Sequence, residues 1–104
     1  MPALALLLLG GCVEITTPPG SATAYFGEWS GPNMTLTVSP RNILYRKRGG
    51  AFDSAYVHTT FRGLAGNDIV YGRRGQNILR VDVPPRRVKG VWTMTVEGTE
   101  LHRR

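Results

Sequence analysis

The chain of 104 residues has one cysteine, Cys12, and two histidines, His58 and His102. A single cysteine cannot form a disulfide within its own chain. Two distant histidines without a second cysteine lack the ligand spacing of a metal site. We therefore expect no metal and no cofactor. A domain this small must be held together by apolar packing and by the hydrogen bonds of a sheet.

Long hydrophobic runs are also missing. A transmembrane helix needs about twenty apolar residues, and the one long apolar stretch, residues 3–9, is roughly half that length. No Lys or Arg precedes Cys12, although secretory signals begin with a positive segment. We expect that the true initiator lies upstream, or that Met1 is internal to a longer signal.

Groups for catalysis are sparse. A nucleophile needs a neighbouring base and an acid that orients the base. Ser54 lies near Asp53 and His58 in the sequence, but proximity along one strand does not make a triad. Turn chemistry accounts for Asp53 and Asp68. We therefore predict that the protein is not an enzyme.

What the chain does have is a short apolar run that ends in two glycines and the cysteine, Leu6-Leu7-Leu8-Leu9-Gly10-Gly11-Cys12. An apolar segment followed by small residues is the pattern of a cleaved secretory signal, and a thiol is the strong nucleophile that acylation needs. Residues 9–12 resemble the lipobox of bacterial lipoproteins. The resemblance implies cleavage between Gly11 and Cys12 and a diacylglycerol on the Cys12 thiol. An ordinary cleaved signal and an unprocessed tail are the alternatives.

The same resemblance predicts a location. Acyl chains on Cys12 would anchor the protein to a membrane on its periplasmic side. In enteric bacteria an Asp after the lipidated cysteine is associated with retention at the inner membrane. Val13 occupies that position here, which favours the outer membrane, with the inner membrane as the alternative.

The net charge of +6 narrows the class of partner. A basic chain suits nucleic acid, anionic lipid or an acidic protein, and an envelope location argues against nucleic acid. We expect a monomer that contacts the membrane through its acyl chains, with an acidic envelope protein or anionic lipid as a possible partner. Two basic clusters are expected at loop tips, where they form either one anion-binding end or two separate solvated tips: Arg46, Lys47, Arg48, Arg73 and Arg74.

Alternation of apolar and polar residues, with Gly and Pro between the segments, predicts an all-β domain. We expect an antiparallel meander of about seven strands, closed as a barrel or folded as a sandwich. The predicted strands are 34–38, 42–47, 54–62, 69–71, 76–83, 90–96 and 99–102. Pro84 and Pro85 should break the sheet and leave Arg86, Arg87 and Lys89 in an exposed loop.

The domain organisation follows from the breakers near the N-terminus. Residues 1–11 are the predicted signal peptide. Residues 12–24 are the lipidated cysteine and a flexible tether, because Thr16-Thr17-Pro18-Pro19-Gly20-Ser21 favours extended, irregular chain. Residues 25–104 are the predicted folded domain.

Two further resemblances concern this domain. Gly27-Glu28-Trp29 is similar to the Gly-x-Trp signature that opens lipocalin barrels, and Gly90-Val91-Trp92 repeats it. The chain is too short for a full lipocalin calyx, so we expect both Trp side chains to close the core. Residues 25–104 also resemble small proteobacterial lipoproteins of uncharacterised role, through the early Gly-x-Trp, the paired prolines and the Trp-x-Met-x-Val-x-Gly-x-x-Leu stretch at residues 92–101.

Together these features predict a lipid-anchored envelope lipoprotein with a non-enzymatic binding or structural role. The alternative is a periplasmic inhibitor of a lysozyme or another envelope hydrolase. The basic charge argues against an inhibitor of a basic lysozyme, which acidic loops would suit better.

Overall fold

The computed structural model describes residues 13–49 and 54–104. Gly11 and Cys12 of the lipobox lie outside these ranges, as does Asp53. The described chain is all-β, and nine strands form one antiparallel sheet. The predicted all-β, barrel-like fold is confirmed, with nine strands in place of about seven.

Two short 3-10 turns, η1 (Pro19–Ser21) and η2 (Thr23–Tyr25), precede the first strand. Two differences account for the higher strand number. The first strand was not predicted, and predicted strand 76–83 is divided between two strands at Arg80. The strands are β1 (Gly27–Ser30), β2 (Met34–Val38), β3 (Asn42–Lys47), β4 (Ala55–Ala65), β5 (Asp68–Tyr71), β6 (Asn77–Leu79), β7 (Val81–Val88), β8 (Val91–Val96) and β9 (Thr99–Arg103).

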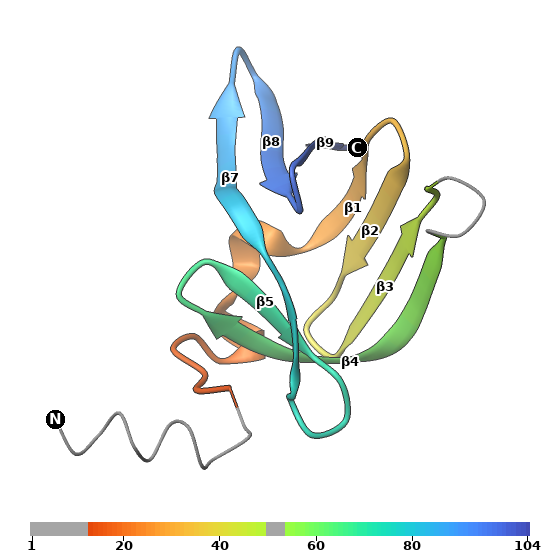
Figure 1. Ribbon diagram of the computed structural model, residues 1–104. Helices are drawn as coiled ribbons and strands as arrows, with labels where there is room; N and C mark the ends of the chain where they lie inside the picture. Colours follow the sequence, from red (N-terminus) through yellow and green to blue (C-terminus); the bar gives the residue numbers. More distant parts are fainter. Residues whose placement is uncertain (1–12, 50–53) are drawn as a thin grey trace, which may run out of the picture.

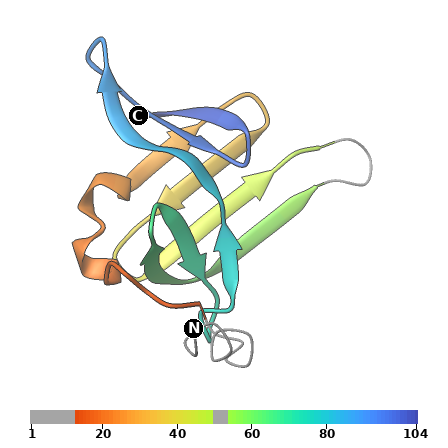
Figure 2. The same ribbon diagram turned by 60° about the vertical axis from the view of Figure 1, so that its left-hand side comes forward.

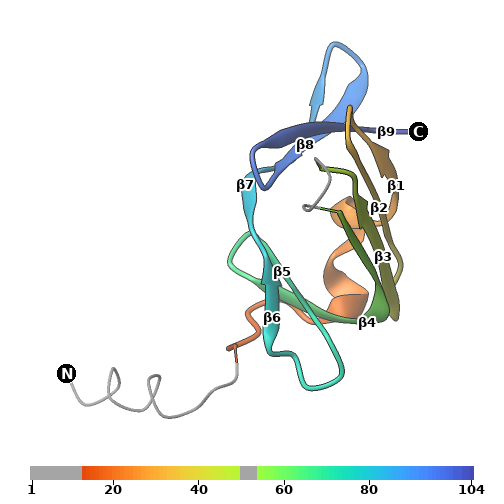
Figure 3. The ribbon, with the colours of Figure 1, turned by 45° about the vertical axis from the view of Figure 1, so that its right-hand side comes forward.

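The sheet has the order β6-β5-β4-β3-β2-β1-β9-β8-β7. Neighbours in the sheet are therefore neighbours in the chain, except where β1 pairs with β9. The sheet curls, so that β1–β4 face β5–β7 across the molecule (Figure 3). Because Arg80 alone separates β6 from β7, one bent segment pairs first with β5 and then with β8 (Figure 2). The arrangement is a barrel-like meander rather than two separate stacked sheets.

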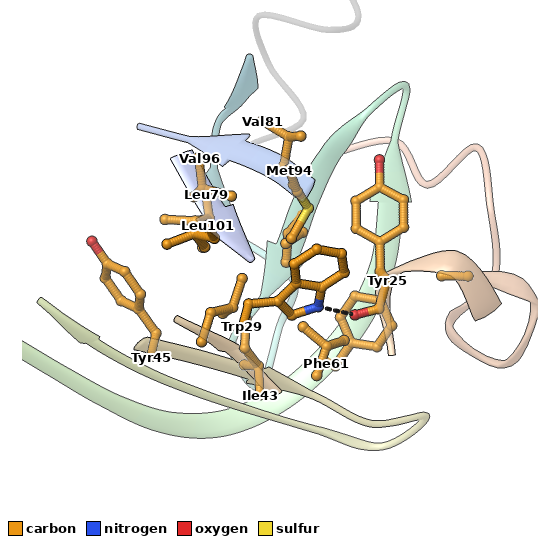
Figure 4. Packing of buried hydrophobic residues seen from close by; sticks show 14 of the residues in the cluster. Tyr25, Trp29, Ile43, Tyr45, Phe61, Leu79, Val81, Met94, Val96 and Leu101 are labelled. Atoms are coloured by element: carbon orange, nitrogen blue, oxygen red, sulfur yellow. Dashed lines mark hydrogen bonds between the residues drawn. The ribbon is translucent and has the colours of Figure 1, made fainter. Parts of the chain in front are cut away.

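The inside of the curled sheet is packed with apolar side chains (Figure 4). Trp29 is 1 % exposed, and its indole N–H donates a hydrogen bond of 2.9 Å to the Tyr25 carbonyl. Trp29 therefore lies in the core, as predicted. Other side chains that are almost completely buried are Leu36, Val38, Ile43, Phe61, Ile69, Val70, Met94, Val96 and Leu101.

Trp92 departs from the prediction, because it is only partly buried. The pairing of β8 with β9 ends at Thr93, so Trp92 lies one residue beyond it and pairs with Arg87 of β7. The guanidinium carbon of Arg103 lies 4.8 Å from the Trp92 ring centroid and 5.6 Å from that of Trp29. Arg103 thus lies over both indole rings, and Trp92 packs against the core from its margin.

Pro84 and Pro85 also correct a prediction, since both lie within β7. In the sheet order β7 is an edge strand, and its register with β8 shifts between Val81 and Val83 and again between Val83 and Arg86, where the prolines lie. Proline has no N–H to give to a ladder, and edge strands and bulges tolerate that loss. Arg86 and Arg87 therefore lie in a strand, and only Lys89 occupies the turn that follows.

The segment predicted as a tether packs against β4 well before Tyr25. The amides of Thr16 and Thr17 donate to the Leu64 carbonyl at 2.7 and 3.1 Å, and the Leu64 amide donates to the Thr17 carbonyl at 2.9 Å. Gly63 permits this approach, because a Cβ at that position would collide with the Thr17 carbonyl. The chain is thus bound to the sheet from Thr16.

Candidate binding surface

The two basic clusters lie on either side of the first half of β4. Arg46 and Lys47 end β3, and Arg48 follows them. Arg73 and Arg74 lie in the turn between β5 and β6, residues 72–76. Two hollows separate these clusters, and Tyr56 of β4 lines both of them. The clusters therefore flank one strand. The sequence alternatives, one anion-binding end or two separate solvated tips, did not specify this arrangement.

Arg46 and Tyr56 form the clearest contact on this surface. They are cross-strand partners, and the Arg46 guanidinium carbon lies 5.3 Å from the Tyr56 ring centroid. Tyr56 is 61 % exposed, the largest exposure among the prominent exposed apolar and aromatic side chains. A cation over an exposed aromatic ring contributes about 0.5–1 kcal/mol. The contact therefore presents an arginine and an aromatic face together at the surface.

The first hollow has a volume of about 410 Å³. Its walls are the end of β3, Arg48, Ser54 and the start of β4. The Arg48 amide donates a hydrogen bond of 2.7 Å to the Asn33 carbonyl. This hydrogen bond fixes the position of the backbone just after β3. Arg46 and Arg48 also line a smaller pocket of about 180 Å³ beside the β1–β2 turn.

The second hollow, of about 680 Å³, lies between β4 and the β5–β6 turn. A hydrogen bond within the turn stabilises it, because the Arg74 amide donates to the Gln76 side-chain oxygen at 3.1 Å. Gly72 and Gly75 have φ angles of 103° and 67°, which non-glycine residues rarely adopt. No Asp or Glu is found among the described residues that line either hollow. The surface is therefore positive, with polar and aromatic groups between its charges.

Of the residues considered for catalysis, Ser54 and His58 lie within the described ranges. His58 lies exposed on β4, where it pairs with Leu44, and His102 lies exposed on β9. Ser54 is exposed just before β4. Within residues 13–49 and 54–104, no group of three or more His, Cys, Asp or Glu side chains is placed to hold a metal ion.

Two tyrosines have perturbed acidity, and both belong to the core. Burial, with a smaller effect of the Asp68 charge, raises the pKa of Tyr25 to about 12. Its hydroxyl donates 2.8 Å to the Asn67 carbonyl. Burial also raises the pKa of Tyr45, with smaller effects of Glu97 and Tyr71. Both phenols stay neutral at ordinary pH, as packing inside the sheet requires.

Comparison of the chain with protein-family models, curated proteins and solved structures finds no match in any of the three. The described part of the chain contains no helix with the length and apolar character needed to span a membrane.

Proposed function

We propose that the protein is a bacterial lipoprotein, held in the cell envelope by acyl chains on Cys12, with a non-enzymatic binding role. The observation that carries the anchor is the placement of the only cysteine directly after Leu9, Gly10 and Gly11 at the end of an apolar run. Val13 after the cysteine favours the periplasmic face of the outer membrane.

The packing of Thr16 limits how far the proposed anchor could lie from the domain. The chain is bound to β4 at Thr16, so only residues 13–15 separate that point from Cys12. An extended chain spans about 3.3–3.6 Å per residue, which limits the distance from Cys12 to Thr16 to roughly 14 Å. A lipid on Cys12 would therefore hold the domain close to the bilayer surface, without a long tether.

A further contact of Thr16 supports a proposal for the end of the domain that would face the membrane. The Gly66 amide donates a hydrogen bond of 2.8 Å to the Thr16 hydroxyl, so the β4–β5 turn lies beside Thr16. We therefore propose that this turn is the part of the domain nearest to the lipid.

The binding role is supported by the surface and by the core. Apolar side chains pack the inside of the sheet, so a partner would meet the outside. The exposed outside carries the arginines around Tyr56, and the whole chain has a net charge of +6. An acidic envelope protein or an anionic lipid is the partner that this charge suits best. We propose that the protein acts as a monomer.

Membrane fractionation of the full chain tests the anchor. The wild-type protein should be recovered with the membranes and should incorporate a clickable fatty acid. Cys12→Ala should lose both properties, whereas Val13→Ala, next to the acylation site, should keep them. Equal membrane recovery and labelling of Cys12→Ala and wild type would contradict the proposal.

A further inference from the structure

One strand of the sheet changes its partner half-way along its length. The first half of β4, through Thr60, pairs with β3, and from Phe61 onward it pairs with β5 (Figure 1). The register shift between Phe61 and Gly63 marks the change. Within residues 13–49 and 54–104, no strand pairs with residues 55–59 on the side away from β3. This side of β4 is therefore an open sheet edge.

The hydrogen bonds around the change of partner show which backbone groups face this edge. The Phe61 amide donates a hydrogen bond of 3.0 Å to the Arg41 carbonyl, so the backbone N–H and C=O groups of Phe61 point toward β3. The Gly72 amide donates a hydrogen bond of 2.9 Å to the Thr60 carbonyl. The N–H and C=O groups of Thr60 therefore point to the side away from β3. Because the direction alternates along an antiparallel strand, Tyr56 and His58 direct their N–H and C=O groups to the open edge.

A space lies along the same edge. The hollow of about 680 Å³ is lined by four consecutive residues of β4, 56–59. Successive side chains of a strand point to opposite faces, so a hollow that reaches all four runs along the edge of the strand. The opposite wall is Tyr71 and the β5–β6 turn. The hollow thus lies where an added strand would run, about 4.8 Å from β4.

The side chains around this hollow carry positive charge, which favours the binding of an acidic segment. Arg73 and Arg74 are exposed on the turn that forms the far wall, and Arg46 lies over the ring of Tyr56 at one end. Gln76 and Asn77 add polar side chains to the same wall. The described residues that line the hollow include no carboxylate to balance these cations. An occupant with acidic side chains complements this wall, and a basic one is repelled by it.

We propose that the open edge of β4 at Tyr56 and His58 binds an extended acidic peptide segment, which adds to the sheet as a further strand. Backbone hydrogen bonds to β4 would provide the pairing, and Arg73 and Arg74 would select the acidic side chains. This inference rests on the proposed binding role, for which it names the site and the class of partner.

A titration with synthetic peptides tests the proposal on the full-length chain in nonionic detergent. The probes are a capped peptide of alternating glutamate and valine, its lysine counterpart, and the glutamate peptide N-methylated at alternate residues. We expect the glutamate peptide to bind and to shift the backbone amide signals of Tyr56 and His58. The other two should bind at least tenfold more weakly. Equal binding of the methylated and unmethylated peptides would reject strand addition.

Two double variants distinguish an effect at the site from an effect of the overall charge. The double variant Arg73→Gln/Arg74→Gln should bind the glutamate peptide about fivefold more weakly, the loss expected for two exposed charge pairs. Arg86→Gln/Arg87→Gln on β7 removes the same charge elsewhere and should bind as wild type does. An equal loss in both double variants would show a general charge effect and overturn the proposal.

The backbone is tested at His58, whose amide faces the open edge and takes no part in the pairing with β3. His58→Pro removes that amide and should abolish binding, while His58→Ala should bind like wild type. Slow hydrogen exchange of the Tyr56 and His58 amides in the free chain would contradict the proposal. It would mean that another segment of the chain, or at high concentration a second copy, already covers the edge. Lipidation of Cys12 does not enter these assays, so the anchor and the peptide site can fail independently.

Discussion

Replacing Gly63 by alanine should release the N-terminal segment from the sheet. Gly63 has a φ angle of 122°, and an added Cβ would collide with the Thr17 carbonyl and lie 2.9 Å from Ile15. The strained backbone costs about 1–3 kcal/mol. The three backbone hydrogen bonds that join Thr16 and Thr17 to Leu64 add about 0.5–1.5 kcal/mol each if they break. If all three hydrogen bonds break, we therefore expect Gly63→Ala to lower the free energy of unfolding by about 2.5–7.5 kcal/mol.

Urea denaturation measures this loss, and hydrogen exchange localises it to the Thr16, Thr17 and Leu64 amides. Gly66→Ala is the matched control, because Gly66 also has a positive φ but nothing lies within 4 Å of an added Cβ. The control should lose only about 1 kcal/mol, the cost of the backbone conformation. If both variants lost equal stability and the Thr16 amide stayed protected in Gly63→Ala, the packing of this segment against Gly63 would be refuted.

Three other outcomes follow from the structure. Trp29→Phe should lower the free energy of unfolding by about 1–3 kcal/mol, because it leaves the buried Tyr25 carbonyl without the indole N–H, and chemical denaturation measures that loss. Below pH 10 the Tyr25 phenol should not affect the free energy of unfolding. Between pH 10 and 12 that free energy should fall as the pH rises, because the folded state holds the phenol proton more tightly than the unfolded state does. Thermal denaturation at several pH values shows the fall, which should be shallower in Tyr25→Phe; an identical slope would reject this origin. The protein at large excess should leave the activity of a basic lysozyme unchanged in a turbidity assay, since its exposed clusters have the same sign of charge, and strong inhibition would favour the inhibitor alternative.

Strands with regular alternation were predictable from sequence. Met34, Leu36 and Val38 are buried on one face of β2, as their spacing of two indicates. The first strand was missed because its four residues include a glycine and one buried side chain. The strand at Pro84 and Pro85 was missed because proline excludes a central strand, and the sequence does not show that β7 is an edge with register shifts.

The candidate site was predictable only in part. Clusters of arginine next to glycine indicated the exposed positions of Arg48 and Arg73. The open edge of β4 has no sequence signal, because it depends on where β4 leaves β3 and joins β5. The packing of Thr16 and Thr17 against Leu64 is equally hidden, because Thr16 and Leu64 lie 48 residues apart in the chain.

Intact mass spectrometry of the membrane-extracted protein, beside Cys12→Ala, tests the central claim most directly. We expect a wild-type chain that starts at Cys12 and carries the additional mass of acyl groups, and a variant without that mass. A wild-type chain that retains Met1 and carries no acyl group would contradict the lipid anchor, and with it the envelope location from which an acidic envelope partner was inferred.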